Sequence, residues 1–316
     1  MNRLFKVSTL LVYAAITFTF TSCNDDDDNG GIDYNANVNK NIVTAANPEL
    51  ARLEFPKVKN GKSIILKYYS GDTYGLNYCV EWDTEKKSQR WSCYMMVDHH
   101  HSNYDKQHTY KGNAGRYDPN RNPGNHPNER QYPYDPQLPA QYRWSDDLFV
   151  HSGYDHGHIC PSADRQYSKE ANYQTFYMTN MQPQLKEFNQ TDYLWEYMEQ
   201  QVRKWTPNTI GDTLFVCKGG TIDTENQILT RIQGKMIVPK YFYMALLSKK
   251  KGQYSALAFW AEHKKTEKSK THYLRNYVIT IDELEARTGI DFFCNLPDGI
   301  EHKVESKVAY NYWGIR

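Results

Sequence analysis

Short stretches dense in β-branched and aromatic residues recur along the chain, and they constrain its fold more than any other feature. Each is bounded by turn-forming residues, which is typical of strands joined by loops. The stretches are residues 63–69, 91–97, 175–181, 212–219, 240–248, 254–262 and 276–281. This pattern predicts a central, largely antiparallel sheet.

Helical segments are fewer. Residues 188–205 carry apolar side chains at helical spacing, namely Leu194, Trp195, Met198 and Val202. A second helix is expected after Thr280, because Thr280 and Glu283 form a capping box and Gly289 supplies a stop. The chain is therefore predicted to be an α+β protein with its sheet flanked by helices. The polar segment 99–143 is too long for a simple connection and is expected to be a surface insertion near a site.

The N-terminus has the features of an export signal. Arg3 and Lys6 precede an apolar run at residues 10–20, which is too short to span a membrane. The "TFTSC" that ends at Cys23 resembles the lipobox of bacterial lipoproteins, whose cysteine is lipidated. The following "NDDDDN" resembles an acidic export tag for the outer face of the cell, and a merely solvated acidic linker is the alternative. We therefore expect a signal peptide (1–22), a lipidated, flexible acidic tether (23–56), one domain (57–316) and an outer-membrane, surface-exposed location.

Charge and cysteine content limit the function only weakly. Without residues 1–22 and the acidic run, 36 basic and 33 acidic side chains remain, so a polyanionic partner is compatible with the charge but not required by it. Cysteines beyond Cys23 occur at 79, 93, 160, 217 and 294, without the spacing of a zinc site. In an exported protein Cys79 is expected to pair with Cys93, or Cys160 with a downstream cysteine.

The stretch "SGYDHGHICPSADR" at residues 152–165 places His156 and His158 two residues apart. If residues 154–159 are extended, both imidazoles point to the same face. Structural zinc is disfavoured, because no further ligands lie within sequence reach. Asn189 and Glu199 follow at and beyond the start of a predicted helix. A neutral imidazole that takes a proton from water, with an amide oxygen and a carboxylate that hold hydrated Mg²⁺, predicts hydrolysis assisted by a hard metal ion.

Three blocks in order resemble the DNA/RNA non-specific endonuclease family, the ββα-metal nucleases that include endonuclease G. The blocks are "YDHGHICPSADR", "TNMQPQLKEFNQ" and "WEYMEQQVR". Later stretches such as "VCKGGT" and "IDELEARTGIDFFCNLPD" also resemble the family, so the likeness covers residues 67–308. The resemblance implies that His158 is the catalytic base, that Asn189 is the direct metal ligand, and that Glu199 binds metal-coordinated water.

The resemblance also implies supporting residues. Asn180 matches an amide that supports the site, and Arg130 matches an arginine that contacts phosphate. Asp155 is expected to orient or support the turn. One departure is that His156 replaces the family's arginine, so a permanent charge gives way to a group that titrates near pH 6.5. His156 is still expected to help stabilise the charged transition state.

A second departure concerns spacing. Asn189 and Glu199 are ten residues apart where the family usually has eight, which would set the side chains about 80° apart on one ideal helix. Glu196 would lie closer to the Asn189 face, but the register of "WEYMEQQVR" favours Glu199. An insertion of two residues before the helix would remove the conflict.

The function implied by the resemblance is a metal-dependent nuclease that cuts DNA and RNA with little regard for sequence and leaves 5′-phosphates. Mg²⁺ is the expected cofactor, with Mn²⁺ or another divalent cation as alternatives. A membrane partner is expected through the lipid anchor, and the oligomeric state is left open, with a homodimer among the alternatives. Rival interpretations are a catalytically lapsed nucleic-acid-binding lipoprotein, a phosphodiesterase for small nucleotides, and a polysaccharide or adhesion module.

Overall fold

The computed structural model describes residues 36–71, 75–97, 114–205 and 210–316. Within these residues a seven-stranded antiparallel sheet has the order β1-β2-β3-β6-β9-β10-β11. The strands are β1 (Ser63–Tyr69), β2 (Leu76–Asp83), β3 (Ser88–Val97), β6 (Thr213–Gly220), β9 (Tyr241–Lys250), β10 (Gln253–Glu262) and β11 (Val278–Ile279). Two hairpins stand apart from this sheet, β4 (Asp155–His158) with β5 (Met181–Gln184) and β7 (Ile228–Ile232) with β8 (Met236–Pro239). The predicted α+β class with an antiparallel sheet is confirmed.

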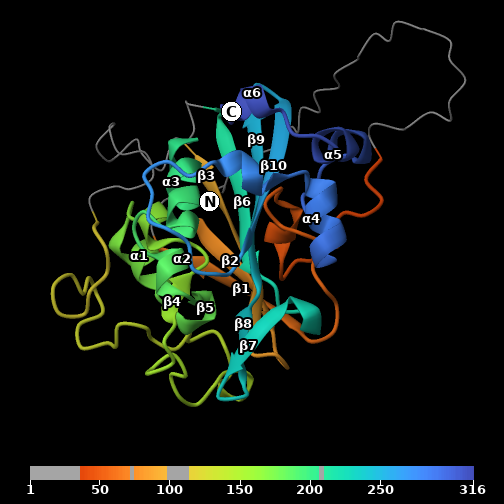
Figure 1. Cartoon of the computed structure of the whole chain (residues 1–316). Coiled ribbons are helices and arrows are strands. Elements are labelled where there is room, and N and C mark those ends of the chain that lie inside the picture. Colours follow the sequence, from red (N-terminus) through yellow and green to blue (C-terminus); the bar gives the residue numbers. More distant parts are fainter. Residues whose placement is uncertain (1–35, 72–74, 98–113, 206–209) are drawn as a thin grey trace, which may run out of the picture. The chain divides into compact units, whose positions relative to one another are not determined.

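Helices cover both faces of the sheet (Figure 1). On one face lie α1 (Lys169–Gln174), α2 (Lys186–Asn189) and α3 (Leu194–Lys204), and on the other α4 (Ile281–Thr288) and α5 (Asp298–Glu305). The short α6 (Tyr310–Trp313) follows near the C-terminus. The first core contains Phe188 and Trp195, and the second contains Trp91, Leu284 and Phe292. Each helix thus buries its apolar side chains against one face of the sheet.

Most predicted strands are confirmed, and two deviations have clear causes. Residues 175–180 are not a strand, because backbone N–H groups there bond to carbonyls three residues earlier and the segment ends in the 3₁₀ helix η5 (Met178–Asn180). Strand β2 was not predicted, because its polar Asn77, Glu81 and Asp83 hide the apolar pattern. These side chains are buried but paired, as in the 2.7 Å ion pair between Glu81 and Arg90.

The helix predicted for residues 188–205 is confirmed only over α3. Helix α2 ends at Asn189, Gln190 is extended, and Asp192 has a positive φ of 69°. The chain therefore turns before α3 begins at Leu194. As a result, Asn189 and Glu199 belong to different helices, and the angular conflict calculated for one ideal helix does not arise.

The N-terminal part of the described chain belongs to the folded body. Phe55, which was assigned to the flexible tether, is fully buried and meets Trp91 edge-on at 5.8 Å. Leu50, in the 3₁₀ helix η1 (Pro48–Ala51), lies in the same core, and the side chain of Asn41 donates to the Pro56 carbonyl at 3.0 Å. The structure therefore moves the boundary between tether and domain from residue 56 to a point no later than residue 36.

Several predictions lie outside the described residues. These are the signal peptide, Cys23, the acidic run that follows it, and the His99–His101 run. In the described part of the chain no helix is both long and apolar enough to cross a membrane.

The cysteines that the structure describes are all free, buried thiols, so neither predicted disulfide is present. Cys79 and Cys93 do lie directly opposite each other on β2 and β3, and Cys217 follows opposite Cys93 on β6. Cys160 lies in the first core. Cys217 lies in the second core, on the other face of the sheet, and Cys294 lies beside that core. Neither downstream cysteine is therefore placed to pair with Cys160.

Half of the capping box predicted for α4 is confirmed, namely the cap by Thr280, whereas the Glu283 side chain pairs with Arg287. The Thr280 cap gives a stability prediction. The Thr280 hydroxyl accepts a hydrogen bond from the Glu283 backbone N–H at 3.1 Å, and Gly289 ends the helix with a φ of 66°. We expect Thr280→Ala to lower the free energy of unfolding by about 1 kcal/mol, because one helix N–H loses its partner. Denaturant unfolding measures this, and Thr280→Ser, which keeps the hydroxyl, should match the wild type.

Candidate active site

The β4–β5 hairpin positions two histidines on one surface. β4 pairs antiparallel with β5, with His156 opposite Pro183 and His158 opposite Met181. The predicted extended conformation is therefore confirmed, and side chains two apart on a strand share a face. Both histidines line a cavity of about 540 Å³.

The same cavity brings together residues from three separate stretches of the chain. Of the residues predicted from sequence, Asp155, His156, His158, Asn189 and Glu199 all line it. Arg130 and Asn180 do not line it. The cavity lies on the face of the sheet covered by α3, between that helix and the β4 strand.

His158 has an environment that favours its neutral form. Its ring meets Phe176 edge-on at 4.7 Å, and its Nε2 is buried without a hydrogen-bond partner among the described residues. Burial lowers the pKa of His158 well below 6.5, and the charges of Arg116 and His156 act in the same direction. An unpaired, neutral imidazole at the cavity wall is suited to accept a proton.

Asp155 connects β4 to the end of α2. Its carboxylate accepts a 3.1 Å hydrogen bond from the Gln190 side chain and a longer 3.5 Å contact from the Asn189 Nδ2. Because the Asn189 nitrogen points at Asp155, its carbonyl oxygen is left without a donor among the described residues. Asp155 thus lies beside the amide of Asn189, and its expected role in supporting the turn stays a prediction.

Glu199 is held between two cations. Its carboxylate lies 2.5 Å from the Nζ of Lys218 on β6 and 3.9 Å from the guanidinium of Arg203. Burial raises the pKa of Glu199, while Lys218 and Arg203 oppose that shift. Glu199 therefore balances the charges of Lys218 and Arg203 and also faces the cavity.

Glu196 also lines the cavity, one helical turn before Glu199. It accepts hydrogen bonds from Gln200 at 2.7 Å and from the Asp192 backbone at 3.3 Å, and it lies 3.3 Å from Arg203. Arg203 therefore links both glutamates. The geometry keeps Glu196 and Glu199 together at the site and does not separate their roles.

His156 is fixed by stacking and by one carboxylate. Its ring is nearly parallel to Tyr132 at 3.8 Å and to Phe149 at 4.2 Å. Its Nε2 lies 3.1 Å from both carboxylate oxygens of Asp147. Although burial acts to raise the pKa of Asp147, the hydrogen bond and charge of His156 lower it overall. His156 is therefore held by Asp147, whereas an arginine at this position would carry a permanent charge.

Arg130 lies outside the cavity. Its guanidinium is 3.6 Å from Asp147 and packs on the Tyr134 ring at 4.9 Å. The arginine that reaches the cavity from this part of the chain is Arg116, whose guanidinium lies over the Phe176 ring at 4.7 Å. The structure thus brings Arg116, rather than Arg130, next to His158.

Asn180 is a buried connector. Its Oδ1 accepts from the Cys160 backbone at 2.9 Å and the Ser92 hydroxyl at 3.1 Å, and its Nδ2 donates to the carbonyls of Cys160 and Thr175, both at 2.8 Å. These bonds tie the segment after His158 to β3 and to the end of α1. Asn180 supports the site without touching the cavity.

Known proteins of similar sequence identify the family of this chain. Residues 70–299 match the DNA/RNA non-specific endonuclease family. The chain belongs to that family. A nuclease from Nostoc sp. is 31% identical over 192 residues, which cover 58% of this chain and 67% of that protein. The mitochondrial nuclease 1 of Schizosaccharomyces pombe is 26% identical over 187 residues, covering 55% and 57%. Bovine mitochondrial endonuclease G is 25% identical over 171 residues, covering 51% and 55%, so the chain spans between about half and two thirds of these relatives.

A solved structure has the same fold. The crystal structure titled as the EndoG/EndoGI complex matches with a TM-score of 0.54 and 17% identity, covering 69% of this chain and 83% of that one. The ββα-metal arrangement predicted from sequence corresponds here to β4, β5 and the helices α2 and α3 that follow.

Members of this endonuclease family depend on a metal ion, and the residues around Asn189 fit one. The donors at the cavity are the carboxamide oxygen of Asn189 and the carboxylates of Glu196 and Glu199. Oxygen donors of this kind suit a hard divalent cation, and no cysteine lines the cavity. The grouping of these three oxygen donors at one cavity is the observation that favours a bound cation.

Sequence reasoning missed several residues of this endonuclease site. Arg203 could have been found, because it lies four residues after Glu199 and thus on the same face of α3. Lys218 is a lysine inside an otherwise apolar strand and is almost fully buried, which indicates a buried partner. Arg116 lies in the polar segment that was expected to approach a site, but nothing in its spacing singled it out.

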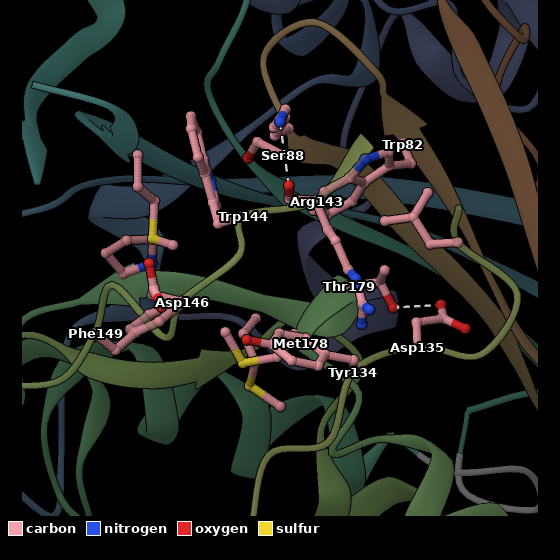
Figure 2. Close-up of a pocket in the computed structure, with 15 residues that line it drawn as sticks. Trp82, Ser88, Tyr134, Asp135, Arg143, Trp144, Asp146, Phe149, Met178 and Thr179 are labelled. Atoms are coloured by element: carbon pink, nitrogen blue, oxygen red, sulfur yellow. Dashed lines mark hydrogen bonds between the residues drawn. The ribbon is translucent and has the colours of Figure 1, made fainter. Parts of the chain in front are cut away.

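A second hollow lies beside the site and is shown in Figure 2. Phe149 lines both hollows. Trp82, Trp144 and Met178 make the second one largely apolar, and at its edge the Thr179 hydroxyl donates to Asp135 at 2.7 Å. Its volume of about 30 Å³ admits little more than one water molecule. The chemistry of this endonuclease therefore belongs to the larger cavity.

The role of Asn180 gives a prediction. We expect Asn180→Ala to lower the free energy of unfolding by about 3 kcal/mol, because it leaves the buried groups of Cys160, Thr175 and Ser92 without partners. Denaturant unfolding with a fluorescence readout measures the change. Ser92→Ala removes one of these bonds, together with the 2.6 Å bond from Ser92 to Gln89, and should cost less, about 2 kcal/mol. Equal stability of Asn180→Ala and the wild type would contradict the connector role.

Proposed function

We propose that this chain is a metal-dependent endonuclease that hydrolyses phosphodiester bonds in DNA and RNA with little regard for sequence. The family and the relatives named above support a nuclease hydrolase activity. The observation that carries the proposal is that His158, Asn189 and Glu199, which are separated in sequence, line one cavity.

His158 is the general base of the proposed reaction. Its neutral Nε2 takes a proton from a water molecule as the water oxygen attacks phosphorus. The bond from phosphorus to the 3′-oxygen breaks, and that oxygen takes up a proton from solvent, which leaves a 5′-phosphate and a 3′-hydroxyl. General base catalysis of this kind contributes roughly 10²- to 10⁴-fold.

Asn189 is the proposed metal ligand, through its carboxamide oxygen. Mg²⁺, or alternatively Mn²⁺, would supply neutralisation of the charge that develops on the phosphate. Glu199 and Glu196 accept hydrogen bonds from water in the cavity, and Asp155 keeps the Asn189 amide turned toward the cavity. The single protein ligand leaves room for a substrate.

Arg116 is the proposed phosphate-binding group. It lines the cavity, where its charge attracts the backbone of a nucleic acid. Arg203 also lines the cavity, but its charge is balanced by Asp164, Glu196 and Glu199. Arg130 and His156 act more indirectly, through Asp147. Since these groups address only phosphate and water, base identity is not read, which agrees with cleavage of both DNA and RNA.

The cell location remains part of the proposal. Lipidation at Cys23 and export of the acidic stretch that follows would place the nuclease on the outer membrane, facing outward. Such an anchored nuclease could release nucleotides from foreign nucleic acid.

Cleavage of supercoiled plasmid tests the catalytic assignment. We expect His158→Ala to lower the rate by roughly 10²- to 10⁴-fold with Mg²⁺ present, because the proton acceptor is lost. Asn189→Ala should lose activity, and a chelator should stop the wild type. His302→Ala, which removes an exposed histidine on α5, is the matched control and should cut normally.

Two outcomes would favour a rival. Plasmid retardation without cleavage, with either Mg²⁺ or Mn²⁺, would indicate a lapsed nuclease that only binds nucleic acid. Cleavage of a chromogenic phosphodiester with intact plasmid would indicate a small-nucleotide phosphodiesterase. Glu199 is better tested as the pair Glu199→Gln with Lys218→Met, since Glu199→Gln alone leaves a buried lysine uncompensated.

The low pKa of His158 gives a pH prediction. Because its pKa lies well below 6.5, the imidazole stays neutral as the pH falls through 6.5. The value of kcat/KM for a short duplex should therefore stay level there and fall only at clearly lower pH, as His158 becomes protonated. Initial rates between pH 5 and 8 at constant ionic strength test this. An acid limb centred at 6.5 or above would contradict it.

A further inference from the structure

A group of carboxyls lies between α4 and α5. These helices cover the face of the sheet opposite α2 and α3 (Figure 1), whose residues line the catalytic cavity. One carboxylate oxygen from each of Asp282, Glu285 and Glu305 lies within 4.8 Å of the others. Asp282 and Glu285 are three residues apart on α4, so they share a face, and Glu305 comes from the last turn of α5. The cluster therefore brings together side chains from two different helices.

Glu305 is the residue that makes this more than a surface group of acids. Its side chain is 95% buried, since only 5% of the residue is exposed, and its Oε1 has no hydrogen-bond partner. A buried carboxylate oxygen without a donor is costly, and native proteins rarely keep one without an unseen partner. The partner must be able to interact with Asp282 and Glu285 at the same time.

The surrounding charges do not supply that partner. Among the described residues Asp282, Glu285 and Glu305 form no ion pair, and Arg287, the basic residue on α4, is engaged by Glu283. Asp291 and Glu301 add negative charge nearby and share only the amide of Asn39.

We propose that Asp282, Glu285 and Glu305 form a structural Ca²⁺ site that ties α4 to α5. Ca²⁺ binds oxygen ligands at about 2.3–2.6 Å, so two ligands on opposite sides of the ion lie about 4.6–5.2 Å apart. The three oxygens, which all lie within 4.8 Å of one another, are close enough together to be ligands of one such ion. The Phe292 backbone N–H donates to Glu285 at 2.7 Å and fixes that carboxylate, and exposed Asp282 leaves room for water to complete the coordination.

Calcium suits the site better than Mg²⁺. Mg²⁺ demands shorter distances and near-ideal octahedral geometry, and it keeps most of its water. Three protein carboxylates at this spacing, one of them buried, match the looser and more highly coordinated Ca²⁺. The site is separate from the cavity that contains Asn189, so it does not depend on the nuclease proposal.

Thermal unfolding and calorimetric titration of the full chain, after treatment with a chelator, test the site. We expect saturating Ca²⁺ to raise Tm by on the order of 5 °C. Glu305→Gln should bind Ca²⁺ at least about tenfold more weakly, because affinity follows the number of ligand charges. This variant should still fold in chelator, since it removes a buried acid. Glu283→Gln, on the same helix but outside the cluster, is the matched control and should respond like the wild type.

The Asn189→Ala variant separates this site from the catalytic cavity. It should keep the Ca²⁺-dependent rise in Tm. A rise that disappears in Asn189→Ala but persists in Glu305→Gln would place the ion in the cavity and overturn the proposal. So would the absence of any rise in the wild type, or a larger rise with Mg²⁺ than with Ca²⁺. Loss of plasmid cleavage in Asn189→Ala bears only on the nuclease proposal.

Discussion

The pairing of β4 with β5 is the interaction on which the site depends. Four residue pairs align the strands, and this register points both histidines at the cavity. Position 157 is glycine, which leaves room for a neighbouring side chain: a Cβ on Gly157 would lie 2.3 Å from the side chain of Gln184, which is fully buried. The bonds of Asn180 then hold the chain immediately after His158, so the position of the imidazole is set from both directions.

Electrostatic balance is the second condition of the site. Lys218 and Arg203 face Glu199, and Arg203 also reaches Asp164, 3.1 Å away, which accepts a 2.7 Å hydrogen bond from Tyr94. Each buried charge in this chain of contacts has a neighbour of opposite charge. That neighbour offsets part of the free energy lost when the charge leaves water. Removing one member leaves another uncompensated. For this reason the glutamates of α3 serve folding and chemistry together, and single substitutions there do not separate the two.

Sequence alone predicted the class of fold and five of the residues that line the cavity, because those rest on local patterns. The alternation of His156, Gly157 and His158 needs only strand geometry, and the Thr280 cap needs only neighbouring residues. Contacts between distant residues were harder to predict. No local sequence pattern shows that Arg116 rather than Arg130 reaches the cavity. Nor does one show that the chain turns at Asp192, so that Asn189 is not part of the helix α3. The buried polar residues of β2 were missed because their partners, such as Arg90, lie on another strand.

The segment that leads into the first strand closes the second core. The ring of Phe55 lies edge-on to Trp91, and the side chain of Asn41 holds the backbone of Pro56 beneath it. A shortened protein that begins at residue 57, the domain boundary suggested by composition, would therefore lack the buried ring of Phe55 and expose part of the second core. Residues 41–56, which composition assigns to a tether, are therefore part of the folded core.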